Sequence, residues 1–298
     1  MAAALARDVE RFLERLAHGR RLSPHTAAAY RRDLAALLGW CEARGIASWR
    51  ALDAEALRGF VAAEHRRGLA PKSLQRLLSA CRSLLRWLLA EGLVDANAAS
   101  GLRAPRAPRR LPQVLDADEM ARLVEVPAEG PLGLRDRAML ELFYSSGLRL
   151  SELCALRWRD LDLDEGLVRV LGKGAKTRVV PVGSHARSAL RSLRGATAAA
   201  GPDAPVFTGR NGAAIAPRTV QARLRRLAER QGIWKRVHPH LLRHSCASHV
   251  LESSGDLRGV QELLGHADIA TTQIYTHLDF QHLARVYDDT HPRARRKR

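Results

Sequence analysis

A chain of 298 residues with 46% hydrophobic side chains is long enough for two domains and too apolar to be disordered. Its 49 basic and 31 acidic residues leave a formal charge of +18, which favours a polyanionic partner, first nucleic acid and second an anionic membrane surface. No apolar stretch approaches the ~20 residues that span a bilayer, and four scattered cysteines favour reduced thiols, so we expect a cytoplasmic protein.

The first hundred residues predict only helices. Asp, or Ser followed by Pro, is a typical helix start, and Gly is a typical stop. We therefore expect a small helical bundle at residues 1–99, with its basic excess facing phosphates; for any single arginine, a solvated surface is the alternative. The predicted helices run up to Gly19, from Ser23-Pro24 to Gly45, from Asp53 to Gly68, and from about 71 to 92.

Residues 100–114 alternate prolines with arginines. Proline fixes φ and removes a backbone donor, which excludes both a helix and a central strand. We expect an extended basic linker here.

Residues 115–298 predict a second domain of mixed α and β structure. The segments 167–171 and 177–182 alternate as strands do, around a glycine-bearing turn at 172–176. The fold class is therefore mainly α with a small β-sheet. Helices are expected near 116–125 with Asp116 as cap, 133–145, 149–158, 184–194, 217–231, 240–253, 256–264 and 279–287.

Two segments place a cation where an anion would suit it. Arg149 follows the helix breaker Gly147 at a predicted helix start, which is unfavourable for a cation unless an anion binds there; the alternative is a surface arginine paired with Glu152. Lys173 lies at the predicted hairpin tip in a chain with only five lysines. A lysine kept there can release a proton that arginine holds, although a solvated turn lysine is the alternative.

Two further segments carry histidines and a tyrosine. His240, Arg243 and His244 share a helix face by their spacing, and the arginine beside the histidines opposes a zinc site and suits an anion. His266 follows a predicted helix end, and Tyr275 lies nine residues later. Taken alone, these residues are also compatible with a capping or core histidine and a packing tyrosine.

The order Arg149, Lys173, His240-x-x-Arg243, His266 and Tyr275 resembles the active-site set of the tyrosine recombinase (phage-integrase) family. The resemblance covers essentially the whole chain, and segments 251–266 and 275–284 are most similar to the bacterial XerC group. It implies a core-binding helical bundle at 1–99, the linker, and a catalytic α+β domain at 115–298.

The resemblance also implies a mechanism. Tyr275 would attack the scissile phosphate and form a 3′-phosphotyrosyl link, with Arg149 and Arg243 clamping the phosphate oxygens. By the same resemblance, His266 adds a hydrogen bond, Lys173 protonates the leaving 5′ oxygen, and His240 is a general acid or base. No cofactor, ATP or metal is implied.

The implied partners are double-stranded DNA with two half-sites, a XerD-like recombinase in a heterotetramer, and a septal DNA translocase as activator. Together they would resolve chromosome and plasmid dimers at cell division. The predicted helix within 279–298 would enter a groove on the neighbouring subunit; docking on its own domain is the alternative.

Two other functions fit parts of the pattern. A type IB topoisomerase shares the Arg, Lys, Arg, His, Tyr chemistry but relaxes a single duplex. A non-catalytic DNA-binding regulator would use helices 217–231 and 240–253 as readers and would form no covalent adduct.

Overall fold

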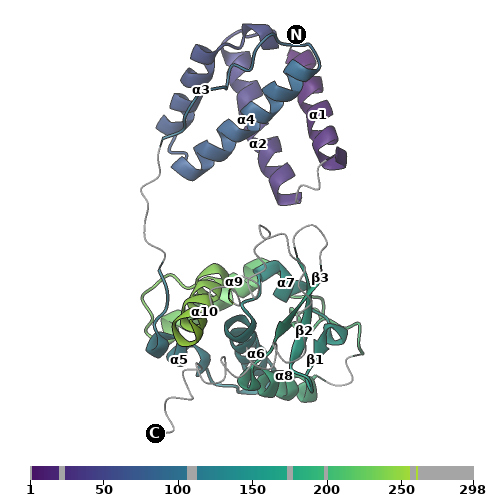
Figure 1. The fold of residues 1–298 in the computed structure, drawn as a ribbon, viewed down its shortest axis with the longest axis vertical. Coiled ribbons are helices and arrows are strands. Elements are labelled where there is room, and N and C mark those ends of the chain that lie inside the picture. Colours follow the sequence, from purple (N-terminus) through teal and green to yellow (C-terminus); the bar gives the residue numbers. More distant parts are fainter. Residues whose placement is uncertain are drawn as a thin grey trace. The chain divides into compact units, whose positions relative to one another are not determined.

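The computed structural model describes residues 2–19, 24–105, 113–172, 177–197, 201–255 and 260. The chain divides into two compact units, Met1–Leu111 and Pro112–Arg298, each with its own apolar core. The predicted class, mainly α with a small sheet, is confirmed (Figure 1), whereas the boundaries 1–99, 100–114 and 115–298 stay a prediction. No described helix is long and apolar enough to cross a membrane.

The first unit is a bundle of the four predicted helices. Asp53 caps the third as expected, because its side chain accepts a hydrogen bond from Ala56 N at 2.8 Å. Leu102 and Ala104 pack against this core, so the start of the predicted linker adheres to the bundle. The helices are α1 (Ala2–Gly19), α2 (Pro24–Ala43), α3 (Ala54–Arg66) and α4 (Pro71–Ala90), and a short 3-10 helix at Trp49–Ala51 was not predicted.

The described helices of the second unit lie where the sequence predicts them, except that the helix expected at 149–158 ends at Ala155. Asp116 and Glu119 form a reciprocal capping box, with bonds of 2.8 and 3.0 Å between each side chain and the other's backbone N. The predicted helices at 256–264 and 279–287 lie outside the described residues, apart from helical Val260. The helices are α5 (Ala117–Val124), α6 (Gly130–Ser146), α7 (Leu150–Ala155), α8 (Ser184–Ala196), α9 (Pro217–Arg230) and α10 (Pro239–Ser254), with a 3-10 helix at Trp158–Asp160.

The sheet is antiparallel with strand order β1-β2-β3. Strands β2 (Leu167–Leu171) and β3 (Thr177–Pro181) were predicted; β1 (Leu161–Asp162) is only two residues long and was missed. Val168 and Val170 point to the buried face, opposite Val180 and Arg178 respectively. Directly paired residues share a face of a sheet, so Arg178 lies on the buried side.

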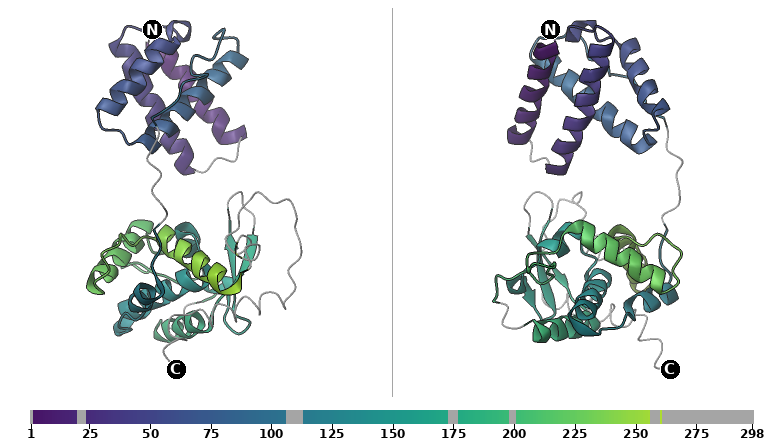
Figure 2. Two further views of the ribbon diagram at one scale, coloured as in Figure 1. Left: turned by 60° about the vertical axis from the view of Figure 1, so that its left-hand side comes forward. Right: turned by 180° about the vertical axis from the view of Figure 1, so that it is seen from behind.

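Helix α6 is the centre of the second unit. It contacts α5, α8, α10 and strand β3, an arrangement visible in Figures 1 and 2. It ends at Gly147, whose φ of 53° is a left-handed conformation that glycine adopts without strain. Ser146 Oγ donates to Pro181 O at 2.7 Å, so the end of α6 is joined to strand β3.

The chain entering the second unit is held against the helix that carries Arg243. Leu115 N donates to Ser245 Oγ on α10 at 2.8 Å. Lys235 Nζ donates to Val114 O at 3.0 Å and to Glu119 Oε2 at 2.5 Å. The scarcity of lysine therefore does not by itself indicate proton chemistry, since Lys235 makes a structural ion pair.

Candidate active site

Arg149 precedes α7 directly, as its N-cap residue. Its backbone N and Nη1 donate to Oε2 and Oε1 of Glu152 at 2.8 and 2.9 Å. The Glu152 side chain is 2% exposed and the Arg149 side chain 32%. The expected alternative, an Arg149–Glu152 pair, is thus present, and it fixes a guanidinium that remains accessible.

Arg178 belongs to this cluster and was missed by the sequence analysis. Its Nη1 and Nη2 donate to Oε1 and Oε2 of Glu152 at 2.7 and 2.9 Å. Burial alone would raise the pKa of Glu152, but the hydrogen bonds and charges of Arg178 and Arg149 lower it to about 2. A signal existed in the strand: Arg178 has the same parity as buried Val180, and a cation on a buried face needs an acceptor.

Arg243 joins the cluster from α10. It is buried, and its Nη1 donates to the carbonyl oxygen of Gly147, two residues before Arg149. Burial, followed by the charges of Arg149 and Arg178, lowers the pKa of Arg243 to about 10, so it stays protonated at neutral pH. Three guanidinium groups and one carboxylate leave a net positive site, which suits an anion.

The predicted shared face of His240, Arg243 and His244 on α10 is only partly present. His240 and His244 are exposed whereas Arg243 is buried, so the three do not share one environment. The capping histidine is His238, whose Nδ1 accepts from Leu241 N at 3.1 Å. Burial and the charges of His240 and Arg236 lower the pKa of His238. His240 is therefore neither the helix cap nor a core residue.

The structure brings Arg149 and Arg243 to one segment, 147–149. Lys173, His266 and Tyr275 lie outside the described residues, so their roles stay predictions. Within the described part of the chain, no cluster of three or more His, Cys, Asp or Glu side chains could hold a metal ion.

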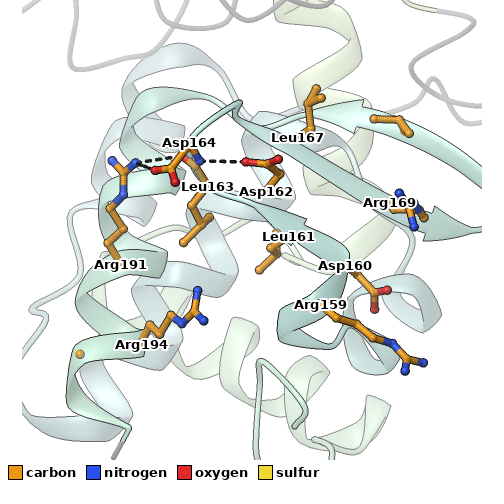
Figure 3. A pocket seen from close by; sticks show the side chains of 12 residues that line it. Arg159, Asp160, Leu161, Asp162, Leu163, Asp164, Leu167, Arg169, Arg191 and Arg194 are labelled. Carbon is orange, nitrogen blue, oxygen red and sulfur yellow. Dashed lines mark hydrogen bonds and ion pairs between the residues drawn. The ribbon is translucent and has the colours of Figure 1, made fainter. Parts of the chain in front are cut away.

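A cavity of about 630 Å³ lies elsewhere in the second unit, beside β1, β2 and α8. Figure 3 shows both basic and acidic side chains around it; Arg191, for example, donates to Asp164 Oδ1 at 2.9 Å and to Leu163 O at 3.0 Å. Of the predicted catalytic residues that the structure describes, Arg149, His240 and Arg243, none lines it. The cavity is therefore not the candidate active site.

Comparisons with known proteins decide the family. Residues 113–282 match the phage integrase family model, and residues 9–92 match the N-terminal SAM-like domain of phage integrases. The chain belongs to the phage integrase family. It is 67% identical to tyrosine recombinase XerC of Xanthomonas campestris pv. campestris, covering 100% of this chain and 92% of the relative.

Another member of the phage integrase family, tyrosine recombinase XerC of Pseudomonas aeruginosa, is 56% identical, covering 97% of this chain and 96% of the relative. The crystal structure of XerH site-specific recombinase bound to a palindromic difH substrate, a post-cleavage complex, shares the fold. Its TM-score is 0.69 at 22% identity, covering 87% of this chain and 78% of that one.

Membership confirms the predicted activity. The chain is a site-specific tyrosine recombinase, an enzyme that binds DNA and cuts and rejoins it. Identity above half over nearly the full length of such relatives does not favour a topoisomerase or a non-catalytic regulator.

Proposed function

We propose that this recombinase resolves chromosome and plasmid dimers at cell division in the cytoplasm. It acts with a XerD-like recombinase as a heterotetramer on a DNA site with two half-sites, and a septal DNA translocase activates the pair. The supporting observation is the 67% and 56% identity, over nearly the whole chain, to proteins named XerC.

We further propose the catalytic set Arg149, Lys173, His240, Arg243, His266 and Tyr275. Tyr275 Oη bonds to the scissile phosphorus, the bond from phosphorus to the 5′ oxygen breaks, and the 3′ phosphate stays on the tyrosine. Lys173 gives the departing 5′ oxygen a proton. His240, as general acid or base, accepts the proton of Tyr275 when the tyrosine attacks. A 5′ hydroxyl of the partner strand then reverses these steps, since a phenolate is an adequate leaving group.

The arginine cluster supports this chemistry. A phosphodiester is already an anion, and its pentacoordinate transition state gathers more charge on the non-bridging oxygens. Arg149 and Arg243 are permanent cations. Glu152 fixes Arg149, and Arg243 is fixed by its hydrogen bond to the carbonyl oxygen of Gly147, two residues before Arg149. One such fixed donor contributes about a hundredfold or more in rate. Because the phosphotyrosyl link conserves the bond energy, the exchange requires neither ATP nor a metal. His266 supplies a further hydrogen bond to the phosphate.

A suicide substrate tests the nucleophile. DNA nicked next to the cleavage point loses the short fragment that would reverse the reaction, so the covalent adduct accumulates and can be mapped by peptide sequencing. We expect the adduct on Tyr275. Tyr275→Phe should form none while binding DNA almost as tightly, because one hydroxyl adds little to an interface of phosphate contacts. An adduct that persists in this variant, with Tyr287 the first suspect, contradicts the assignment.

Strand exchange tests the biological role. Two full sites should recombine when the XerD-like partner is added, and a single supercoiled plasmid without a site should not be relaxed. Efficient relaxation without a site would indicate a topoisomerase, and exchange that ignores the partner would contradict the heterotetramer.

A further inference from the structure

Arg178 stands outside the proposed catalytic set, yet it binds the residue that holds Arg149. We propose that Arg178 is a positioning residue for strand cleavage. It neutralises the negative charge of Glu152, so that the positive charge of Arg149 can stabilise the scissile phosphate. The inference rests on the proposed role of Arg149 at that phosphate.

The contacts around Glu152 support this division of labour. Nη1 and Nη2 of Arg178 donate to the two carboxylate oxygens of Glu152 at 2.7 and 2.9 Å. Lysine cannot form this bidentate geometry. Arg149 reaches the same two oxygens with its backbone N and Nη1 at 2.8 and 2.9 Å. Each oxygen thus accepts two hydrogen bonds, and the carboxylate fixes the guanidinium of Arg149 relative to its own backbone.

Burial places these groups in order from the inside outward. The side chain of Glu152 is 2% exposed, that of Arg178 is 18% and that of Arg149 is 32%. The most accessible cation is therefore Arg149, and Arg178 acts on it through Glu152. Arg178 is also held on the buried face of β3, opposite Val170, so the ion pair joins this strand to the start of α7.

The charges explain why a second arginine is needed. A carboxylate 2.9 Å from Arg149 would by itself cancel most of the field that a bound phosphate feels. With Arg178 present, the three guanidinium groups of Arg149, Arg178 and Arg243 outnumber the one carboxylate by two charges. Without it the excess falls to one, while Glu152 still competes with the phosphate for Arg149.

The first test removes the charge of Arg178. Arg178→Met should slow single-turnover adduct formation on the suicide substrate by about a hundredfold, with DNA affinity changed by less than about threefold. The double variant Arg178→Met/Glu152→Gln removes both charges and should recover at least about tenfold of that loss. Arg178→Lys keeps the charge without the fork and should fall between wild type and Arg178→Met.

The second test changes the charge of the DNA. A neutral methylphosphonate at the scissile position lowers the charge of the transition state by one, so wild type and Arg178→Met should cleave it within about threefold of each other. The matched control is Arg169→Met on the neighbouring strand β2. Arg169 lies on the exposed face, so its replacement should leave both rates unchanged.

Several outcomes overturn the inference. These are an Arg178→Met rate equal to wild type, a double variant as slow as Arg178→Met, or a rate gap that persists on methylphosphonate DNA. In the last two cases Arg178 serves the fold only. If Arg178→Met loses cooperative unfolding, the same comparison is made with Arg178→Lys and Arg178→Lys/Glu152→Gln. Failure of the wild-type chain to form an adduct contradicts the proposed function instead.

Discussion

The two units bury charge very differently. Among the described residues, buried charge in the helical unit is confined to Asp33, which Arg76 holds at 2.8 and 2.9 Å. Burying charge costs more than burying apolar groups of similar size. The second unit therefore gives up stability for fixed geometry along its central helices. Among the described residues of the second unit, the buried charged side chains are Arg135, Asp136, Glu141, Glu152 and Arg243.

Buried charge in the second unit also extends beyond the arginine cluster. Asp136 on α6 is 1% exposed and accepts from Arg223 Nε on α9 at 2.8 Å and from Arg135 Nη2 at 3.2 Å. Arg135 in turn donates to Thr208 O at 2.8 Å. The comparison teaches that, among the described residues, fully buried arginines belong to the second unit, whereas the helical unit keeps its cations at least partly exposed.

The largest effect is expected where the identity of a cation matters more than its charge. If Lys173 is the proton donor, Lys173→Arg should be nearly as damaging as Lys173→Ala, with cleavage about a hundredfold slower or more, because guanidinium holds its proton too tightly. Sulfur in place of the 5′-bridging oxygen leaves without a proton and should restore both variants in the suicide-substrate assay.

The helical unit supplies the control for this prediction. Lys72 is an exposed residue near the start of α4, and Lys72→Arg should leave cleavage unchanged. If sulfur rescues neither Lys173 variant, the proton-donor role is wrong.

The next effect compares the two buried aspartates. Asp136→Asn leaves two arginines near an uncharged group and should lower the free energy of unfolding by about 3 kcal/mol or more. Asp33→Asn should cost only about 1 kcal/mol, since the Arg76 side chain is 39% exposed and water screens its charge. Hydrogen exchange, read separately for each unit, measures both. Equal losses in the free energy of unfolding would mean that burial of the charge does not set the cost of removing it.

A smaller effect should appear as the pH falls. The pKa of Glu152 is lowered from 4.5 to about 2, so its carboxylate stabilises the folded state above pH 4.5. That contribution, about 3 kcal/mol by linkage, is lost as the pH falls toward 2. The stability gap between wild type and Glu152→Gln should therefore narrow from pH 5 to pH 2.5 in denaturant titrations.

Glu64 gives the matched control for the pH experiment. It pairs with Arg67, whose side chain is 75% exposed while that of Glu64 is 13% exposed. Because water screens the arginine, Glu64→Gln should show almost no gap at any pH. A Glu152→Gln gap that is constant with pH would show that packing, not charge, connects Glu152 to stability.

The smallest effect on DNA binding is expected from the C-terminal segment. Leu283, Val286 and Tyr287 form an apolar stripe on a predicted helix too short to be stable alone. Deleting residues 280–298 should spare binding to a half-site but weaken cooperative pairing with the XerD-like partner about tenfold. A gel-shift titration on full sites measures this. Unchanged cooperativity would mean that the segment packs on its own domain.

Local chemistry predicted most of the described elements. Caps such as Asp53 and Asp116 and the alternation in β2 and β3 depend on neighbours in sequence, and they were confirmed. A capping histidine was only an alternative for the segment of His240 and His244, and the residue that caps α10 is His238, which the sequence did not single out.

The arginine cluster shows where sequence reasoning stops. Arg149 and Arg243 were marked by local patterns and by the family resemblance, and Glu152 was named as the alternative partner of Arg149. Arg178 lies 26 residues from Glu152 along the chain, and only the strand register brings them together. Parity could have marked Arg178 as inward-facing, but its acceptor is a tertiary property.

The attachment of the entering chain has a mechanical consequence. The hydrogen bonds from Leu115 N to Ser245 Oγ and from Lys235 Nζ to Val114 O are the first anchors of the described chain after residues 106–112. Ser245 is two residues from Arg243 on the same helix. A displacement of residues 114–115 is thus passed directly to α10, the helix that carries Arg243, and through Lys235 to Glu119 on α5.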